Sequence, residues 1–260
     1  SVRALNRLTE SSIRPAFLLF ISFVFMILFG TVLLLLPKCQ TRSWSFLDAL
    51  FTATSAVCVT GLSVRDVGTE LSWRGQAVLL LLIQIGGLGL ATFVMAIAYL
   101  QQGTFNLRQK AVLRELLSAR VMGNLGRILG RVLAITILFE LLGAVLLFLA
   151  RAEASTLDRV WWAVFHSVSA FCNAGFSLSK DSLVSNAQSV SILLVIATLI
   201  LIGGIGFPVL LDLLRFDVMA LPSFRRWYYK GASNSASALS LHTKLTVVTS
   251  VALVVLGSFL

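Results

Sequence analysis

The sequence predicts an all-α protein that crosses a membrane several times, because its composition, its long apolar runs and the placement of its charges agree. Of the 260 residues, 58% are hydrophobic and 12% are charged, and the mean hydropathy is +0.93. A soluble domain of this size cannot keep so much apolar surface away from water. The 21 basic and 11 acidic residues give a net charge of +10, and the basic residues stand between apolar runs. This placement indicates membrane topology and argues against nucleic-acid binding.

Five apolar runs are the candidates for membrane-spanning helices. The first, residues 16–36, has no charged residue, and at about 1.5 Å per residue it reaches roughly 30 Å, the thickness of the hydrocarbon core. Pro15 and Pro37 flank it where a helix tolerates proline. A signal peptide fits less well, because its apolar region would be shorter and followed by a cleavage pattern. The other runs are residues 75–100, 132–150, 189–211 and 245–260.

The distribution of Lys and Arg predicts the orientation. Residues 1–15, 101–131 and 212–244 together carry 14 of them, whereas residues 37–74 and 151–188 carry seven. Since cytosolic loops are enriched in basic residues, we expect a multi-pass plasma-membrane protein with its N-terminus in the cytosol. The short last run and the initial serine lead us to expect a piece of a longer protein.

The two external segments contain an internal repeat. Residues 47–64 align with residues 161–178 at a constant offset of 114, and seven of the 18 pairs are identical. A Gly-Gly-x-Gly motif follows each copy, at residues 86–89 and 203–206. Each copy therefore predicts a helix, a re-entrant pore loop and a second helix. Because the two units have the same orientation, a pore around an axis normal to the membrane is favoured over inverted transporter repeats.

The predicted organisation follows from this repeat, with four such units forming a pseudo-fourfold pore that is truncated in this chain. The expected parts are a cytosolic N-terminus (1–15), a first helix–pore-loop–helix repeat (16–100), a cytosolic loop (101–131), a second repeat (132–211), a cytosolic linker (212–244) and the start of the first helix of a third repeat (245–260).

The re-entrant stretches are predicted to be half-membrane helices. They cover residues 44–55, with Ser43 as the expected N-cap, and residues 157–170, with Thr156 or Asp158 in that role. Their C-terminal ends would point to the centre of the bilayer, where the negative end of a helix dipole stabilises a dehydrated cation.

The residues that follow these helices are the candidate ion filter. They include no carboxylate, so the ligands would be backbone carbonyls, which suit a monovalent cation such as K⁺. Gly61 and Gly175 would provide the backbone freedom that turns carbonyls toward an axis. We expect the two cysteines to be small apolar spacers, and the glycines of the Gly-Gly-x-Gly motifs to be close-packing positions. The candidate filter residues are Cys58, Val59, Thr60, Gly61, Cys172, Asn173, Ala174 and Gly175.

Other polar residues have two interpretations each. Glu140 lies within a predicted span, where a carboxylate must face protein or water, either as a structural partner or as an ion-coupling group. His166 is expected to be a packed polar residue, and His242 an interfacial one. The basic residues within 101–130 and 225–230 fit anchoring at membrane lipids or a docking surface for a regulatory subunit.

Three segments of the sequence resemble those of a known family. Ser-Ala-Val-Cys-Val-Thr-Gly-Leu at 55–62, Ser-Ala-Phe-Cys-Asn-Ala-Gly-Phe at 169–176 and Leu-His-Thr-Lys-Leu at 241–245 resemble the Ktr/Trk/HKT potassium transporters. Because the first span begins within 16 residues of the start, the resemblance is greatest to the bacterial KtrB membrane subunits. It extends over nearly the whole chain, about two and a half of four repeats.

The resemblance implies four helix–pore-loop–helix units around one pore, with one filter glycine per unit, here Gly61 and Gly175. It also implies K⁺ uptake that often depends on Na⁺, with no enzymatic activity and no cofactor beyond the transported and coupling ions. The implied partners are a second copy of the chain and a cytosolic nucleotide-binding ring subunit of the KtrA/TrkA type.

Three other functions are weighed against this one. A solute symporter would have a ligand cavity at the midplane, and a non-conducting membrane subunit would leave the repeated loops unexplained. An intramembrane enzyme would need paired aspartates, a His-Glu-x-x-His helix or a Ser/His pair at membrane depth, and the sequence has none. The three cysteines are too few and too far apart for a disulfide framework, and no Cys-x-x-Cys pair suggests zinc.

Overall fold

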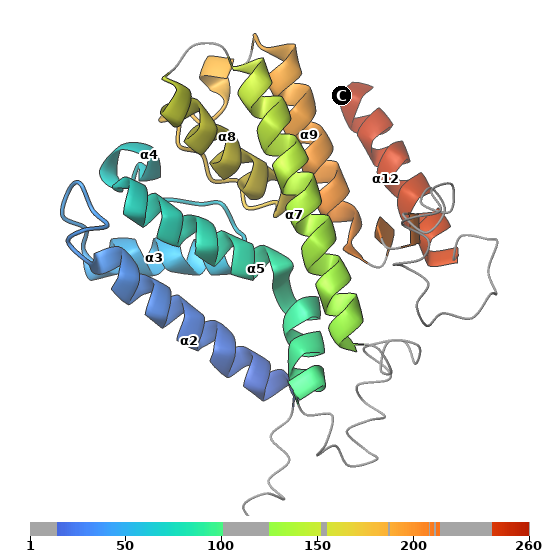
Figure 1. The fold of residues 1–260 in the computed structure, drawn as a ribbon, viewed down its shortest axis with the longest axis horizontal. Helices are drawn as coiled ribbons and strands as arrows, with labels where there is room; N and C mark the ends of the chain where they lie inside the picture. The colour runs from blue at the N-terminus through green and yellow to red at the C-terminus, as the bar shows by residue number, and fades with distance from the viewer. Residues whose placement is uncertain are drawn as a thin grey trace, which may run out of the picture.

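The computed structural model describes most of the predicted membrane part of the chain (Figure 1). The predicted cytosolic segments lie largely outside the described residues, including the basic stretches at 108–120 and 225–230. The described residues are 15–100, 125–151, 155–186, 188–207, 209–210, 212–213 and 241–259.

Within these ranges the regular elements are helices, and extended pairing is limited to one antiparallel bridge between Gln40 and Leu71. Each of the five predicted apolar runs forms a helix. The elements are α2 (Pro15–Leu35), α3 (Phe46–Val57), α4 (Val67–Glu70), α5 (Trp73–Leu100), α7 (Leu125–Ala150), α8 (Thr156–Phe171), the 3₁₀ turn η1 (Val184–Asn186), α9 (Val190–Ile205) and α12 (Leu241–Phe259).

The helices of the described chain are strongly apolar. Gly130–Ala150 of α7 has 21 residues with a hydropathy of 2.7, and by length and composition it is long enough to cross a membrane. Among the described residues, four further apolar helical stretches are shorter than this: Phe20–Leu35, Phe46–Val57, Val190–Ile205 and Thr243–Gly257.

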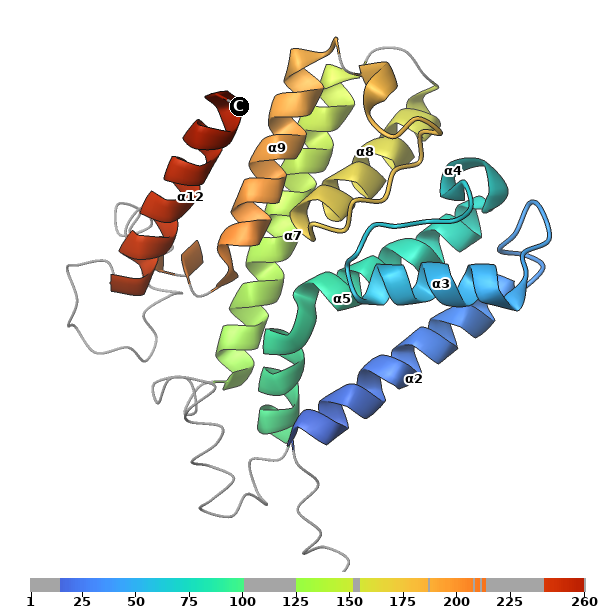
Figure 2. The ribbon, with the colours of Figure 1, turned by 180° about the vertical axis from the view of Figure 1, so that it is seen from behind.

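The helices form two similar units. In the first, the short helix α3 packs against α2 and α5, and in the second, α8 packs against α7 and α9 (Figures 1 and 2). The units share a hydrophobic core, because Phe165 and Phe176 of the second unit belong to the cluster built around α3 and α5. The helix α12 contacts α9 at the edge of the second unit.

The N-caps of both short helices differ from the predicted ones. Ser45, not Ser43, is the N-cap of α3: its hydroxyl accepts from the amide of Asp48, whose carboxylate accepts from the amide of Ser45. This reciprocal capping box needs a spacing of three residues, which Ser43 does not have. Ser155, not Thr156 or Asp158, is the N-cap of α8: its hydroxyl accepts from the amide of Asp158 and donates to the carboxylate of Asp158.

Two glycines of the Gly-Gly-x-Gly motifs break their helices, which corrects the expectation that all six are packing positions. Gly89 interrupts α5 with φ +56° and ψ −167°, and α9 ends at Gly206 with φ +91° instead of continuing to residue 211. A Cβ on Gly89 would meet no atom within 4 Å. Backbone conformation, which favours glycine at positive φ, therefore explains glycine at these two positions.

Three other glycines of the motifs are packing positions, as expected. An added Cβ at each would overlap an atom of a neighbouring element, so only glycine permits the close approach. Gly86 faces the carbonyl of Val57, Gly87 faces the side chain of Cys172, and Gly203 faces the carbonyl of Phe171.

Candidate functional site

The backbone makes the same tight turn after α3 and after α8. The amide of Thr60 donates to the carbonyl of Ser55, and the amide of Ala174 donates to that of Ser169, both over 2.8 Å. The two preceding amides of each turn also match: Cys58 to Thr54 and Val59 to Ala56 in the first, Cys172 to Val168 and Asn173 to Ala170 in the second. We call residues 58–61 the first turn and residues 172–175 the second turn.

Positive φ angles recur at equivalent positions of the two turns. Val59 and Asn173 have φ +54° and +58°, and Gly61 and Gly175 have φ +80° and +73°. Residues other than glycine rarely adopt positive φ, so two such positions separated by a single residue reflect a specific constraint on the peptide groups. The duplication in sequence is therefore a duplication of backbone conformation.

The two turns touch at their glycines. A Cβ on Gly61 would overlap the carbonyl oxygen of Ala174 and lie 3.1 Å from Cα of Gly175. A Cβ on Gly175 would lie 3.4 Å from Cα of Gly61. The turns belong to different units, and they lie on the side of the molecule that faces the viewer in Figure 2.

The turns offer main-chain oxygens as candidate ligands. Cys58 and Thr60 are exposed and Cys172 and Ala174 are buried. No group of three or more His, Cys, Asp or Glu side chains suited to a metal ion occurs in the part of the chain that the structure describes.

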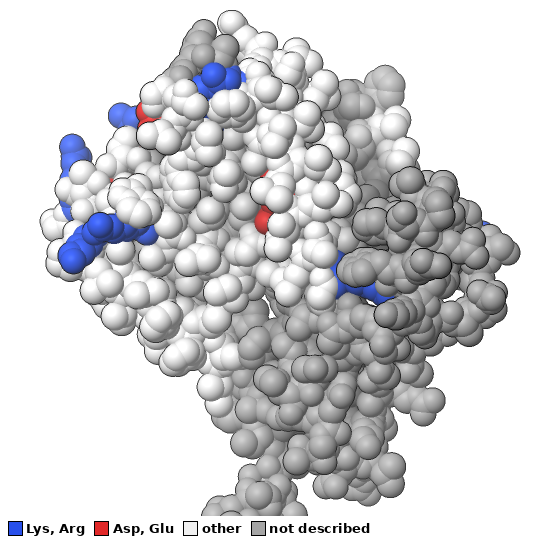
Figure 3. Space-filling view, in the orientation of Figure 1, with Lys and Arg blue, Asp and Glu red and all other residues white. Residues whose placement is uncertain are grey.

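The surface supports membrane embedding of this fold. Figure 3 shows a broad, mostly uncharged face with one small acidic patch near its middle and with Lys and Arg at its rim. Large apolar side chains cover the outer sides of α2, α7 and α12. Among them are Phe25, Phe29, Leu141, Val145 and Leu253, which are 53% to 66% exposed. In water such a surface would be strongly unfavourable.

Comparison with known proteins decides the family. A family model described as TrkH, cation transport protein, matches residues 5–259. The chain belongs to the TrkH family. It is 38% identical over 232 residues to the Ktr system potassium uptake protein B of Bacillus subtilis, a match covering 89% of this chain and 48% of that protein.

Two other relatives match the chain over a similar share of their length. The potassium/sodium uptake protein NtpJ of Enterococcus hirae is 34% identical over 215 residues, covering 82% of this chain and 48% of the relative. The Ktr system potassium uptake protein B of Vibrio alginolyticus is 34% identical over 244 residues, covering 94% and 50%. The TrkH-family chain thus spans about half the length of the curated relatives it matches.

Glu140 of this TrkH-family chain faces protein between three helices. Its side chain is 9% exposed, and the thiol of Cys172 lies 3.9 Å from Oε1 and donates to it. The same thiol lies 4.0 Å from Oε1 of Gln84 on α5. Glu140 therefore lies directly behind the second turn, at the seam between the two units.

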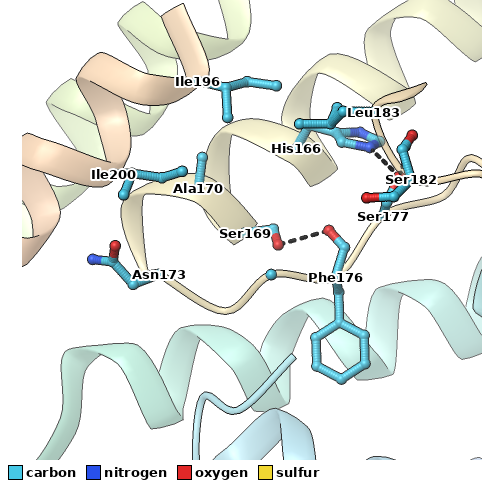
Figure 4. A pocket seen from close by; sticks show the side chains of 11 residues that line it. His166, Ser169, Ala170, Asn173, Phe176, Ser177, Ser182, Leu183, Ile196 and Ile200 are labelled. Atoms are coloured by element: carbon cyan, nitrogen blue, oxygen red, sulfur yellow. Dashed lines mark hydrogen bonds between the residues drawn. The ribbon is translucent and has the colours of Figure 1, made fainter. Parts of the chain in front are cut away.

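His166 is a packed polar residue, as expected. Its Nδ1 lies 2.8 Å from the carbonyl of Trp162, which can only accept, so Nδ1 carries a hydrogen. Its Nε2 lies 2.9 Å from the hydroxyl of Ser177, and its ring stacks on Trp162 at 4.0 Å. His166 thus ties α8 to the segment that leaves the second turn, beside a pocket of about 250 Å³ (Figure 4).

Polar contacts that the sequence did not predict join the two units outside the turns. Nε1 of Trp161 donates to Oε1 of Gln76 over 2.7 Å, and Nε2 of Gln76 donates to the carbonyl of Gly68 over 3.0 Å. Gly68 in turn packs so closely on Leu178 that a Cβ would overlap its carbonyl. The signal in the sequence was a glutamine at the start of an apolar run.

Proposed function

We propose that this chain is part of a K⁺-uptake protein, in which the first and second turns form two of the four walls of a carbonyl-lined selectivity filter. The observation that carries the proposal is the matched pair of turns, with positive φ at equivalent positions and glycine against glycine where they meet. Rings of backbone carbonyls are how proteins replace the hydration shell of K⁺. Relatives named as potassium uptake proteins support the same ion.

The short helices would act as pore helices. Each ends at the cysteine that opens a turn, Cys58 after α3 and Cys172 after α8. The partial negative charge at a helix C-terminus, roughly half an elementary charge, would then lie next to the ion. In this arrangement residues 16–100 and 132–211 are helix–pore-loop–helix repeats, residues 245–260 begin a third, and the N-terminus is cytosolic.

The partners and ion dependence follow the same proposal. Two relatives are named as parts of a Ktr system, which supports a second component, and we take it to be a cytosolic nucleotide-binding ring that gates a membrane homodimer. A third relative is named for potassium and sodium, which supports uptake dependent on Na⁺.

Glu140 carries a second proposed role, in ion coupling, favoured by its burial against Cys172 of the second turn. In the full-length transporter, Glu140→Gln keeps the size and hydrogen-bonding capacity of the side chain and removes the charge. We expect K⁺ uptake to persist with a changed dependence on Na⁺. Uptake with an unchanged Na⁺ dependence would assign Glu140 a structural role alone.

The test of the proposed function uses the full-length gene in a bacterium that lacks its own K⁺ uptake. Growth on limiting K⁺ and ⁸⁶Rb⁺ uptake are measured with and without Na⁺, and with and without a co-expressed ring subunit. Rescue with saturable uptake is expected, and Gly61→Ser or Gly175→Ser should change the preference for K⁺ over Na⁺. Thr198→Val, on the exposed side of α9, is the control. A well-inserted protein that gives no uptake under any of these conditions would refute the proposal.

A further inference from the structure

The second turn has a side-chain attachment to its neighbouring helix. With its amide oriented so that both polar atoms are paired, Asn173 donates to the carbonyl of Ile200 over 3.2 Å and accepts from the amide of Gly204 over 3.1 Å. Ile200 and Gly204 are one helical turn apart on α9, and these two backbone groups pair with each other in a regular α-helix. One amide therefore presents a matching donor and acceptor to a single step of the helix. Figure 4 shows the side chain of Asn173 beside that of Ile200.

Two adjacent glycines make this part of α9 accessible. Gly203 lets the helix approach α8 so closely that a Cβ would overlap the carbonyl of Phe171. At Gly204 a Cβ would lie 3.7 and 3.9 Å from the two polar atoms of the Asn173 amide, in ordinary van der Waals contact. The helix then ends at Gly206, two residues beyond the attachment.

The backbone of the turn does not by itself require asparagine. Asn tolerates positive φ better than most residues, which would be a sufficient reason for its presence. At the equivalent position of the first turn, however, Val59 adopts φ +54° with a β-branched side chain that packs against the apolar core. The same turn is thus built with valine, and the amide of Asn173 needs another explanation.

We propose that Asn173 is a positioning residue whose amide fixes the second turn to α9 and so sets the spacing of the backbone carbonyls of residues 172–175. This inference rests on the filter proposed above and assigns its ion specificity in part to one side chain. The first turn is held by apolar packing instead. Loss of the amide would therefore loosen one wall of the filter and leave the other in place.

Two substitutions separate the amide from the backbone. Asn173→Gly removes the amide and adopts positive φ freely, whereas Asn173→Val removes it and copies the residue of the first turn. Both are made in the full-length transporter, with Thr198→Val as the control, because Thr198 is exposed on α9 and its hydroxyl donates to the carbonyl of Leu194 in its own helix. The measurements are KM and maximal rate of ⁸⁶Rb⁺ uptake, inhibition by Na⁺, and the amount of protein in the membrane.

Asn173 is exposed, so we expect both Asn173 variants to raise KM for Rb⁺, or to lower the discrimination against Na⁺, by up to about tenfold, the effect of losing an ordinary hydrogen bond. The rate per molecule should change less than KM. Wild-type KM and discrimination in Asn173→Gly would overturn the inference. A change of KM or discrimination in Asn173→Val alone would also overturn it, because that result would indicate backbone strain. A loss of membrane protein without a change in ion preference would overturn it as well. Absence of saturable uptake in the wild type and in Thr198→Val would instead refute the proposed function.

Discussion

Alanine at Gly61 should damage transport far more than alanine at Gly175, although the two glycines are equivalent in the repeat. Both have positive φ, so alanine is strained at either position, by about 1–2 kcal/mol. Only at Gly61 does the new methyl group also overlap a backbone atom, the carbonyl oxygen of Ala174. At Gly175 the nearest atom is Cα of Gly61 at 3.4 Å, at the edge of ordinary contact.

The difference can be put as a free energy. Forcing a methyl group into a packed backbone contact costs about 1–3 kcal/mol in addition to the strain. Gly61→Ala is therefore expected to disfavour the native arrangement of the turns by about 2–5 kcal/mol, and Gly175→Ala by about 1–2 kcal/mol. Since about 1.4 kcal/mol corresponds to a factor of ten, the two variants should differ several-fold or more in the population of the native arrangement.

The assay is ⁸⁶Rb⁺ uptake by the full-length transporter in cells without other K⁺ uptake, normalised to the amount of protein in the membrane. We expect clear residual uptake in Gly175→Ala and little or none in Gly61→Ala. Equal uptake in the two variants, or the reverse order, would refute the geometry of the contact between Gly61 and Ala174.

Three further outcomes are expected. Gly203→Ala should reduce the amount of folded protein, whereas Gly204→Ala should be tolerated, because only the methyl group at position 203 overlaps a carbonyl. The measurement is size-exclusion chromatography in detergent, and equal amounts of the two variants would contradict the prediction. Trp161→Phe should lower the melting temperature, since it removes the hydrogen bond to Gln76, worth about 1 kcal/mol. Hydrogen bonds from the backbone and hydroxyl of Ser45 lower the pKa of Asp48 from its ordinary value. The Asp48 carboxylate therefore stabilises the fold fully at a pH above the ordinary pKa of an aspartate, and this stabilisation is lost as the pH falls through the lowered pKa. The difference in melting temperature between the wild type and Asp48→Asn should accordingly shrink only in strong acid.

The sequence was sufficient to predict the helices and the duplication of the helix and turn. Length and apolar character predict the long helices, and an offset of 114 predicts that the second turn repeats the first. The caps were misplaced at Ser43 and at Thr156 or Asp158 because the Ser-x-x-Asp pairs, Ser45 with Asp48 and Ser155 with Asp158, were overlooked. A capping box depends on spacing, and its pattern was in the sequence.

Contacts between units could not be predicted in the same way. Gln76 and Trp161 are 85 positions apart, and no local pattern joins a glutamine in an apolar run to a tryptophan in another repeat. The break at Gly89 has a similar origin. A glycine that packs and a glycine that bends a helix look alike in a motif, and the difference depends on what surrounds each one in three dimensions.

Under the proposed function, the two turns indicate which residues a duplicated carbonyl site must share. Cys58 and Cys172 open the turns, Gly61 and Gly175 close them, and these pairs are identical, whereas Val59 is replaced by Asn173. A backbone ligand depends on the conformation of the chain and not on the side chain that carries it. The positions that fix conformation or allow contact between turns are therefore constrained, while the side chains that support each turn are free to differ, apolar in the first unit and hydrogen-bonded in the second. This division accounts for a repeat whose backbone is nearly the same although most of its residues are not.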